Sequence, residues 1–230
     1  MFRWKMKIQS IYPSMNESAS MLHDGENIKL VIRHSLRPRL KGVKKHEDVR
    51  ITPEGEALAR DFGESIQYTI GELHSSMIPR CIQTLEYIMD NRPEKRIIIE
   101  SPNILTDVFA IDRKVADVSF KEIGSLKKIV KKLLDNDNIP GFRTLNDCVT
   151  LLLDYIFETG NVKNQLDLYC THDLQLAMLY CALYCPNASL DNIESNWPSM
   201  LEGMFFCGKR DDFLCLWRGQ VKRFTDFMTM

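Results

Sequence analysis

Two short apolar runs, far apart in the sequence, each lead directly to a histidine. The first is Ile28–Ile32, just before His34, and the second is Leu166–Thr171, just before His172. Short apolar runs without strict alternation are typical of strands buried on both faces, as in the parallel sheets of α/β proteins. In an open α/β sheet, ligands bind outside the carboxyl ends of the strands. The sequence therefore predicts that both histidines lie at the ligand-binding edge of one sheet.

Helical patterns alternate with the apolar runs. Thr52 and Pro53 predict the start of a helix, as N-cap and first helical residue, and apolar residues at helical spacing continue the pattern to Ile70, before Gly71. A second helix is expected to start at Pro79. Further strands are expected over Glu72–Ser75 and Arg96–Glu100, and further helices over Phe120–Leu134, Leu145–Thr159 and Leu174–Cys185.

This order of elements predicts an α/β fold, with a three-layer, doubly wound and mostly parallel sheet. Between about residues 101 and 165 the alternation stops, which indicates a helical, lid-like insertion over the active-site edge. Glu202–Cys207 and Phe213–Trp217 flank a polar turn and predict a C-terminal hairpin. Residues 2–8 alternate apolar and basic side chains, which is typical of a half-buried strand rather than a signal peptide. We expect the 230 residues to form a single domain.

Composition narrows the classes of function. The formal net charge of −1 argues against general binding of nucleic acid, and no stretch is apolar enough to span a bilayer, so we expect a cytoplasmic protein. The seven cysteines lack a paired Cys-x-x-Cys pattern, so we expect buried reduced thiols. We expect neither a bound metal nor a cofactor. A strongly basic stretch between residues 33 and 50 fits a small anionic ligand better than a polyanion.

The residues at the first strand end are suited to phosphoryl transfer, which needs a nucleophile, cations around the phosphate oxygens and an acid for the leaving group. His34 fits the nucleophile, because a neutral imidazole can be phosphorylated. Arg33, Arg37 and Arg80 fit the cations, because guanidinium groups match phosphate oxygens and keep their charge when partly buried. Like-charge repulsion from these arginines is expected to lower the pKa of His34.

The second strand end supplies the remaining parts. His172 can donate a hydrogen bond to a phosphate oxygen, and Asp173 can protonate the departing alkoxide. Asp173 must then carry a proton at the start of the reaction, which nearby arginines oppose and a bound phosphate dianion favours. Asp107 is the alternative acid, and Asp107 and Ser35 are both candidates for substrate contacts. A single histidine at a strand end is more often structural, but three segments at such junctions favour a phosphate site.

These segments resemble the signatures of the histidine phosphatase superfamily, on its acid-phosphatase side. Residues 33–37 are similar to Arg-His-Gly-x-Arg, and residues 51–55 are similar to Leu-Thr-x-x-Gly. The pattern Ser-Ser-x-x-x-Arg-x-x-x-Thr stands at residues 75–84, and His172-Asp173 matches the late His-Asp pair. Together the matches bracket most of the chain.

The resemblance implies that His34 is the residue phosphorylated and that Asp173 is the proton donor. It implies a phosphate pocket formed by Arg33, Arg37, Arg80 and His172. The aspartate after His172 distinguishes this chain from mutase-like members, which have His-Gly there. Ser35 replaces the family glycine. The chain is also shorter than the secreted acid phosphatases and lacks their signal peptide and disulfides. This second difference implies an intracellular enzyme with a compact lid.

We therefore expect a metal-independent phosphomonoester hydrolase that acts on a small phosphorylated metabolite through a phosphohistidine. Two alternatives stay open. One is a phosphomutase of the same superfamily, and the other is a catalytically weak regulatory module that binds phosphorylated ligands, for which Ser35 is the only support. The N-terminal strand and the late hairpin offer sheet edges through which a homodimer could form.

Overall fold

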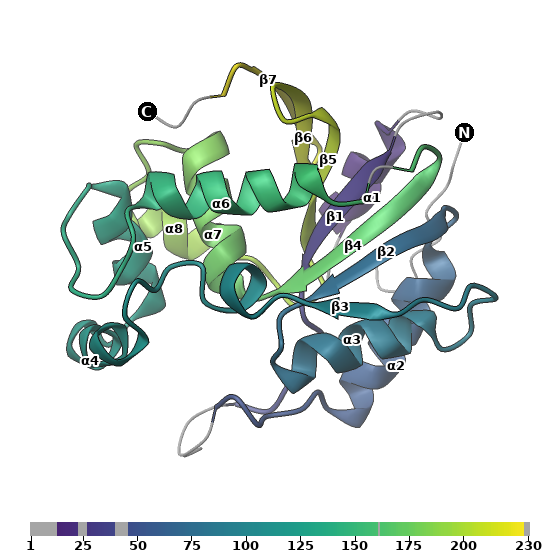
Figure 1. Ribbon diagram of the computed structural model, residues 1–230, viewed down its shortest axis with the longest axis horizontal. Coiled ribbons are helices and arrows are strands. Elements are labelled where there is room, and N and C mark those ends of the chain that lie inside the picture. The colour runs from purple at the N-terminus through teal and green to yellow at the C-terminus, as the bar shows by residue number, and fades with distance from the viewer. Residues whose placement is uncertain (1–12, 23–26, 40–45, 161, 228–230) are drawn as a thin grey trace.

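A mixed sheet with strand order β3-β2-β4-β1-β5-β6-β7 forms the centre of the protein (Figure 1). The computed structural model describes residues 13–22, 27–39, 46–160 and 162–227, so the strand expected over residues 2–8 lies outside the described residues. The strands are β1 (Ile28–Arg33), β2 (Thr69–Ser75), β3 (Ile98–Glu100), β4 (Gln165–Thr171), β5 (Gly203–Lys209), β6 (Asp212–Trp217) and β7 (Gln220–Thr225).

The pairing of β1 with β4 fixes the position of the two histidines. The strands are parallel, in a register that runs from Ile28 opposite Leu166 to Arg33 opposite Thr171. His34 follows β1, and its backbone N–H donates to the Thr171 carbonyl at 3.1 Å, which continues the ladder by one residue. His34 and His172 therefore follow paired strands at the same edge of the sheet, as the apolar runs predict.

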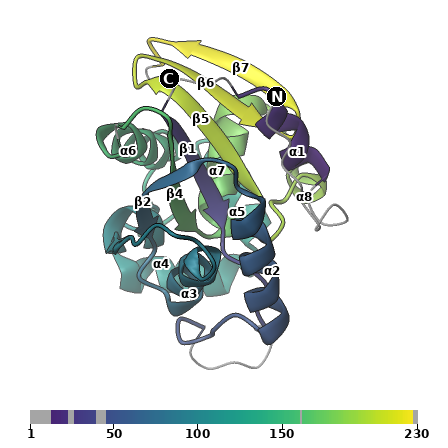
Figure 2. The same cartoon turned by 90° about the vertical axis from the view of Figure 1, so that its right-hand side faces the viewer.

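Helices cover both faces of the sheet, which confirms the predicted three-layer α/β architecture. In Figure 1, α2 and α3 lie on one side of β1, β2 and β4, and α6 and α7 lie on the other. Figure 2 shows α1 beside the antiparallel strands β5 and β6. The helices are α1 (Pro13–Ser20), α2 (Pro53–Ser65), α3 (Pro79–Met89), the π-helix η1 (Pro102–Thr106), α4 (Arg113–Ile123), α5 (Leu126–Leu134), α6 (Leu145–Glu158), α7 (Asp173–Tyr184) and α8 (Leu190–Ser195).

The antiparallel part of the sheet is larger than predicted. The expected hairpin is present as β5 and β6, but β7 then pairs antiparallel with β6. The turn that leads into β7 consists of Arg218 and Gly219, both with positive φ, at 49° and 71°. Two such residues suit a tight hairpin turn whose twist matches that of the strands. The exposed and polar sequence of β7 gave no comparable signal.

Two predicted element boundaries are wrong. The helix expected to continue to Ile70 ends at Ser65, and Gly71 lies inside β2. A Cβ atom at Gly71 would stand 2.1 Å from Oδ1 of Asp167, so glycine is required there for the close approach of this carboxylate rather than for ending a helix. The helix expected over residues 120–134 is instead two helices, α4 and α5, because Gly124 caps α4 with a φ of 69°.

The strand expected over Arg96–Glu100 also differs from the prediction. β3 spans only three residues at the edge of the sheet, and its side chains are partly or fully exposed rather than buried. Helices are present between residues 101 and 165 as predicted, and α5 and α6 pack their apolar faces into the core on that side of the sheet. Among the described residues, no helix is both long and apolar enough to cross a membrane.

A buried ion pair ties the end of α6 to the centre of the sheet. Lys29 of β1 and Asp167 of β4 are each 1% exposed, and Lys29 Nζ lies 3.7 Å from Asp167 Oδ2. The same ammonium donates to the Thr159 carbonyl at 2.5 Å and to the Gly160 carbonyl. Burial lowers the pKa of Lys29, and Asp167 opposes this effect. Because the ammonium is surrounded by acceptors, removing it leaves a buried carboxylate without its cation.

We predict that Lys29→Ala lowers the free energy of unfolding by about 3–5 kcal/mol, as expected for breaking a buried ion pair. Urea unfolding followed by circular dichroism measures this change. Lys132→Ala is the control, because Lys132 pairs with Asp137 through side chains that are both about half exposed, and its loss is expected to cost less than about 1 kcal/mol. Equal losses in the two variants would contradict the stabilising role of Lys29.

Candidate active site

His34 is held as a neutral imidazole with a free nitrogen. The ring is 2% exposed, and its Nδ1 lies 2.8 Å from the Ser35 carbonyl oxygen. A carbonyl only accepts hydrogen bonds, so Nδ1 carries the proton and Nε2 keeps its lone pair. Burial, reinforced by His172, Arg33 and Arg80, holds the pKa of His34 well below its usual range. The ring therefore stays unprotonated, and able to act as a nucleophile, even in mildly acidic solution.

His172 stands beside His34 at the end of β4. The centroids of the two rings are 5.6 Å apart, and the planes meet at 65°. Arg80, in the first turn of α3, places Nη2 3.2 Å from His172 Nδ1, and the Ser76 hydroxyl lies 2.9 Å from His172 Nε2. The predicted meeting of both imidazoles with Arg80 is thus present in the structure.

Three guanidinium groups concentrate positive charge around these rings. Arg33 is buried, Arg37 is about half buried, and burial and mutual repulsion lower the pKa values of Arg37 and Arg80. In each of the three side chains the Nε atom is inaccessible to solvent and has no hydrogen-bond partner among the described residues. Buried donors without an acceptor are rare in folded proteins, so this cluster is suited to receive an anion with several oxygens.

Asp173 is the carboxylate in contact with this cluster. Its Oδ2 lies 2.9 Å from Arg33 Nη2 and accepts a hydrogen bond from Trp197 Nε1 at 3.2 Å, while Oδ1 accepts from the Leu174 backbone N–H at 3.1 Å. Burial would raise the pKa of Asp173, but Arg33 and Trp197 outweigh it, and the pKa is lowered. Asp173 is therefore an anion that orients Arg33.

Asp107, directly after η1, has the opposite electrostatic character. Burial raises its pKa, although Arg113, which is paired with Oδ1, and His172 act against this effect. The side chain is 35% exposed, so the carboxyl group is accessible from solvent. Asp107 therefore keeps its proton to a higher pH than an ordinary aspartate, as a general acid requires.

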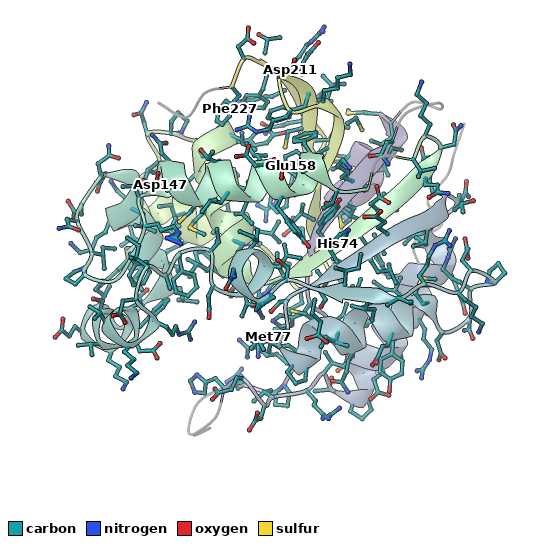
Figure 3. All side chains as sticks on the ribbon, viewed as in Figure 1. His74, Met77, Asp147, Glu158, Asp211 and Phe227 are labelled. Atoms are coloured by element: carbon teal, nitrogen blue, oxygen red, sulfur yellow. The ribbon has the colours of Figure 1, made fainter. Side chains whose placement is uncertain are left out.

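Ser35 and His74 contribute to the fold around the site. Ser35 is fully buried, and its hydroxyl donates to the Gly55 carbonyl at 2.7 Å, so its proposed substrate contact stays a prediction. Figure 3 shows His74 within the sheet, whereas Met77 lies past the end of β2. His74 stacks on Tyr169 with ring centroids 4.7 Å apart and contacts Glu72, which fits the structural role expected for it.

Comparison with known proteins shows the fold but not a close relative. No family model and no curated protein matches the chain. Phosphoglycerate mutase from Bacillus anthracis str. Sterne is 12% identical and matches with a TM-score of 0.55, covering 83% of this chain and 91% of that one. YhfR of Bacillus stearothermophilus is 14% identical, with a TM-score of 0.57 and coverages of 85% and 98%. A mycobacterial glucosyl-3-phosphoglycerate phosphatase is 11% identical, with a TM-score of 0.54 and coverages of 86% and 98%.

The chain has the fold of these solved structures, which include a phosphoglycerate mutase. Within this fold, the superfamily resemblance read from the sequence motifs is consistent with the observed order of strands and helices. The likeness does not confirm the acid-phosphatase branch, so that part of the resemblance stays a prediction.

Some residues of this site are not evident from the sequence. Ser76 lies in the matched Ser-Ser motif, which was a signal for its importance, but its contact with His172 depends on the fold. Trp197 and Arg113 had no signal, because they lie far in sequence from every matched motif. Within the described part of the chain, no group of three or more His, Cys, Asp or Glu side chains is placed to hold a metal ion.

We predict that Arg37→Ala weakens binding of inorganic phosphate about tenfold to a hundredfold, because a charge-assisted hydrogen bond is lost. Isothermal titration calorimetry at fixed ionic strength measures the dissociation constant. Arg39→Ala is the matched control. Arg39 is exposed and lies two residues after Arg37, so this substitution removes the same charge outside the cluster. Equal weakening in both variants would indicate a general charge effect and contradict a specific site at Arg37.

Proposed function

We propose that the protein is a phosphomonoesterase that acts without a metal through a phosphohistidine at His34. One observation carries this proposal: a neutral, buried imidazole with a free Nε2 stands beside a cluster of three guanidinium groups whose Nε atoms have no partner among the described residues. The guanidinium groups supply the positive charge that stabilises a phosphoryl group in transfer. A small phosphorylated metabolite suits a site of this kind, in line with the phosphatase of similar fold whose name specifies glucosyl-3-phosphoglycerate.

The proposed reaction has two displacements. His34 Nε2 attacks phosphorus, the bond from phosphorus to the ester oxygen breaks, and a carboxylic acid gives its proton to the departing oxygen. Water then attacks the phosphohistidine and gives a proton to the same carboxylate, which releases inorganic phosphate and neutral His34. Arg33, Arg37 and Arg80 hold the phosphate oxygens during both steps.

Asp107 and Asp173 are the two candidates for the acid. The motif resemblance favours Asp173, but Arg33 and Trp197 stabilise its anion, and both its oxygens already accept hydrogen bonds. Burial raises the pKa of Asp107 instead, although its Oδ1 is paired with Arg113, and its Oδ2 has no partner among the described residues. The electrostatics therefore favour Asp107 as the proton donor and Asp173 as the residue that orients Arg33.

A phosphomutase is the second candidate function, because a phosphoglycerate mutase has the same fold. It differs from the phosphatase only in returning the phosphoryl group to a second substrate molecule instead of to water. Transfer of labelled phosphate from one sugar phosphate to another would favour the mutase, and release of inorganic phosphate favours the hydrolase.

We predict that the protein hydrolyses p-nitrophenyl phosphate in the presence of EDTA and that His34→Ala lowers kcat on the order of 10³-fold or more, because the nucleophile is lost. Acid-labile, alkali-stable label on His34 after rapid quenching identifies the phosphohistidine. His46→Ala is the control, because its side chain is exposed and only its backbone carbonyl contacts Arg80. Full activity in His34→Ala would contradict the proposal, and phosphate binding without turnover in the wild type would favour the regulatory module.

We also predict that the loss caused by removing the acid depends on the leaving group. Asp107→Asn is expected to lower kcat/KM about 10²- to 10⁴-fold for an alkyl phosphate, whose alkoxide needs a proton, and far less for p-nitrophenyl phosphate. Asp173→Asn is expected to lower kcat/KM about equally for the two substrates, because Arg33 is then misplaced. The reverse pattern would identify Asp173 as the donor.

The pH profile tests the same assignment. A carboxyl group with a raised pKa is protonated in mildly acidic solution and loses its proton as pH rises, whereas His34 stays neutral because its pKa is lowered. The rate with the alkyl phosphate should therefore be highest in mildly acidic solution and fall toward alkaline pH. A rate that still rises from about pH 7 to about pH 9 would exclude a carboxylic acid donor.

A further inference from the structure

We infer that the hydroxyl groups of Ser76 and Thr106 position His172, by fixing its Nε2 as the protonated nitrogen so that Nδ1 faces the phosphate. Ser76 follows β2, and Thr106 is the last residue of η1, so the pair links the parallel sheet to the helical segment above it. The catalytic consequence rests on the function proposed above, whereas the protonation pattern rests on geometry alone.

The contact with Arg80 decides which nitrogen of His172 accepts a hydrogen bond. Arg80 Nη2 lies 3.2 Å from Nδ1, and a guanidinium group can only donate. Nδ1 is therefore unprotonated, and the neutral ring carries its proton on Nε2. This N–H donates to the Ser76 hydroxyl oxygen, 2.9 Å away.

The Ser76 hydroxyl must then pass its own proton onward. Its oxygen accepts from His172 and from the Ile78 backbone N–H at 3.3 Å, so its proton is directed to the Thr106 hydroxyl, 2.9 Å away. Thr106 accepts in addition from the Met77 backbone N–H at 3.1 Å and donates to the Ser101 carbonyl at 3.3 Å. Backbone groups whose roles cannot change thus fix the direction of the whole chain.

Burial makes this direction costly to reverse. Ser76 is 0% and Thr106 is 7% exposed, so a hydroxyl that lost its partner could not readily bond to water instead. The thiol of Cys81 lies 3.8 Å from Nε2 and 3.9 Å from Nδ1 of His172, which also restricts rotation of the ring. The imidazole is therefore constrained in both orientation and protonation.

The constraint determines how His172 serves an incoming phosphate. Because Nε2–H is committed to Ser76, only Nδ1 is directed to Arg80 and hence to the anion site. Nδ1 can donate to a phosphate oxygen only after it takes up a proton, either from solvent or from a phosphate monoanion. The Arg80 Nη2 donor is then released to bond to phosphate as well, so the ring and the guanidinium group respond to the anion together.

The test uses the full chain labelled with ¹⁵N-histidine, with inorganic phosphate as the probe. In the wild type, the ¹⁵N shifts of His172 should show protonated Nε2 and bare Nδ1, and phosphate should protonate Nδ1. Thr106→Val is nearly isosteric but lacks the hydroxyl, so the fixed tautomer should become a mixture and kcat/KM should fall about tenfold, as for one lost hydrogen bond. Ser76→Ala should have the same effect.

Two control variants distinguish positioning from general destabilisation. Thr106→Ser keeps the hydroxyl and should restore both the tautomer and the activity. Ser65→Ala removes a buried hydroxyl that donates to the Phe62 carbonyl on α2, and it should change neither. Protonated Nδ1 in the unliganded wild type, Nδ1 that stays bare with phosphate bound, or a wild-type tautomer and activity in Thr106→Val would each overturn the inference. If the wild type shows the expected tautomer but no phosphatase activity, the proposed function is refuted and the inference about His172 stands.

Discussion

The parallel pairing of β1 with β4 is the constraint on which the site depends. Because Arg33 stands opposite Thr171, the next residues of the two strands bring His34 and His172 to the same edge. The remaining parts reach this edge from other elements: Arg80 from the start of α3, Asp107 from the end of η1 and Trp197 from the segment before β5. A shift of one residue in the pairing would turn one histidine to the opposite face and separate the rings.

Electrostatic imbalance is the second property that defines the site. Arg33, Arg37 and Arg80 repel one another beside a buried neutral imidazole, and the single carboxylate of Asp173, paired with Arg33, offsets only part of their positive charge. Such an arrangement is unfavourable for an isolated fold, because like charges repel and the buried Nε atoms of the three arginines have no acceptor among the described residues. A phosphoryl group relieves both costs at once. Burial lowers the pKa of His34, and Arg33 and Arg80 add to this effect, so two of the arginines that favour an anion also keep the proposed nucleophile neutral.

The parts of the fold that follow from local pattern were predictable from the sequence. The apolar runs of β1 and β4 identified buried parallel strands, and Thr52 with Pro53 located the start of α2. The prediction that Gly71 follows the end of a helix is wrong, because its role depends on the side chain of Asp167, nearly a hundred residues later. β7 was missed because an exposed edge strand carries little apolar pattern.

The residues of the site likewise include some that the sequence predicts and some that only the fold reveals. The sequence indicated which histidines and arginines meet, since each follows a strand or starts a helix. It could not rank Asp173 against Asp107, because the difference lies in Arg33, Trp197 and burial, which are properties of the folded chain. The hydroxyls of Ser76 and Thr106 likewise acquire a role only when β2 and η1 are brought together.

A crystal structure with orthovanadate tests the central claim most directly, because vanadate mimics a phosphoryl group in transfer. The account predicts vanadium bonded to Nε2 of His34, with its oxygens contacted by Arg33, Arg37 and Arg80 and by Nδ1 of His172. Vanadate bound elsewhere, or bound here with Nε2 of His34 turned away from the metal, would contradict the account.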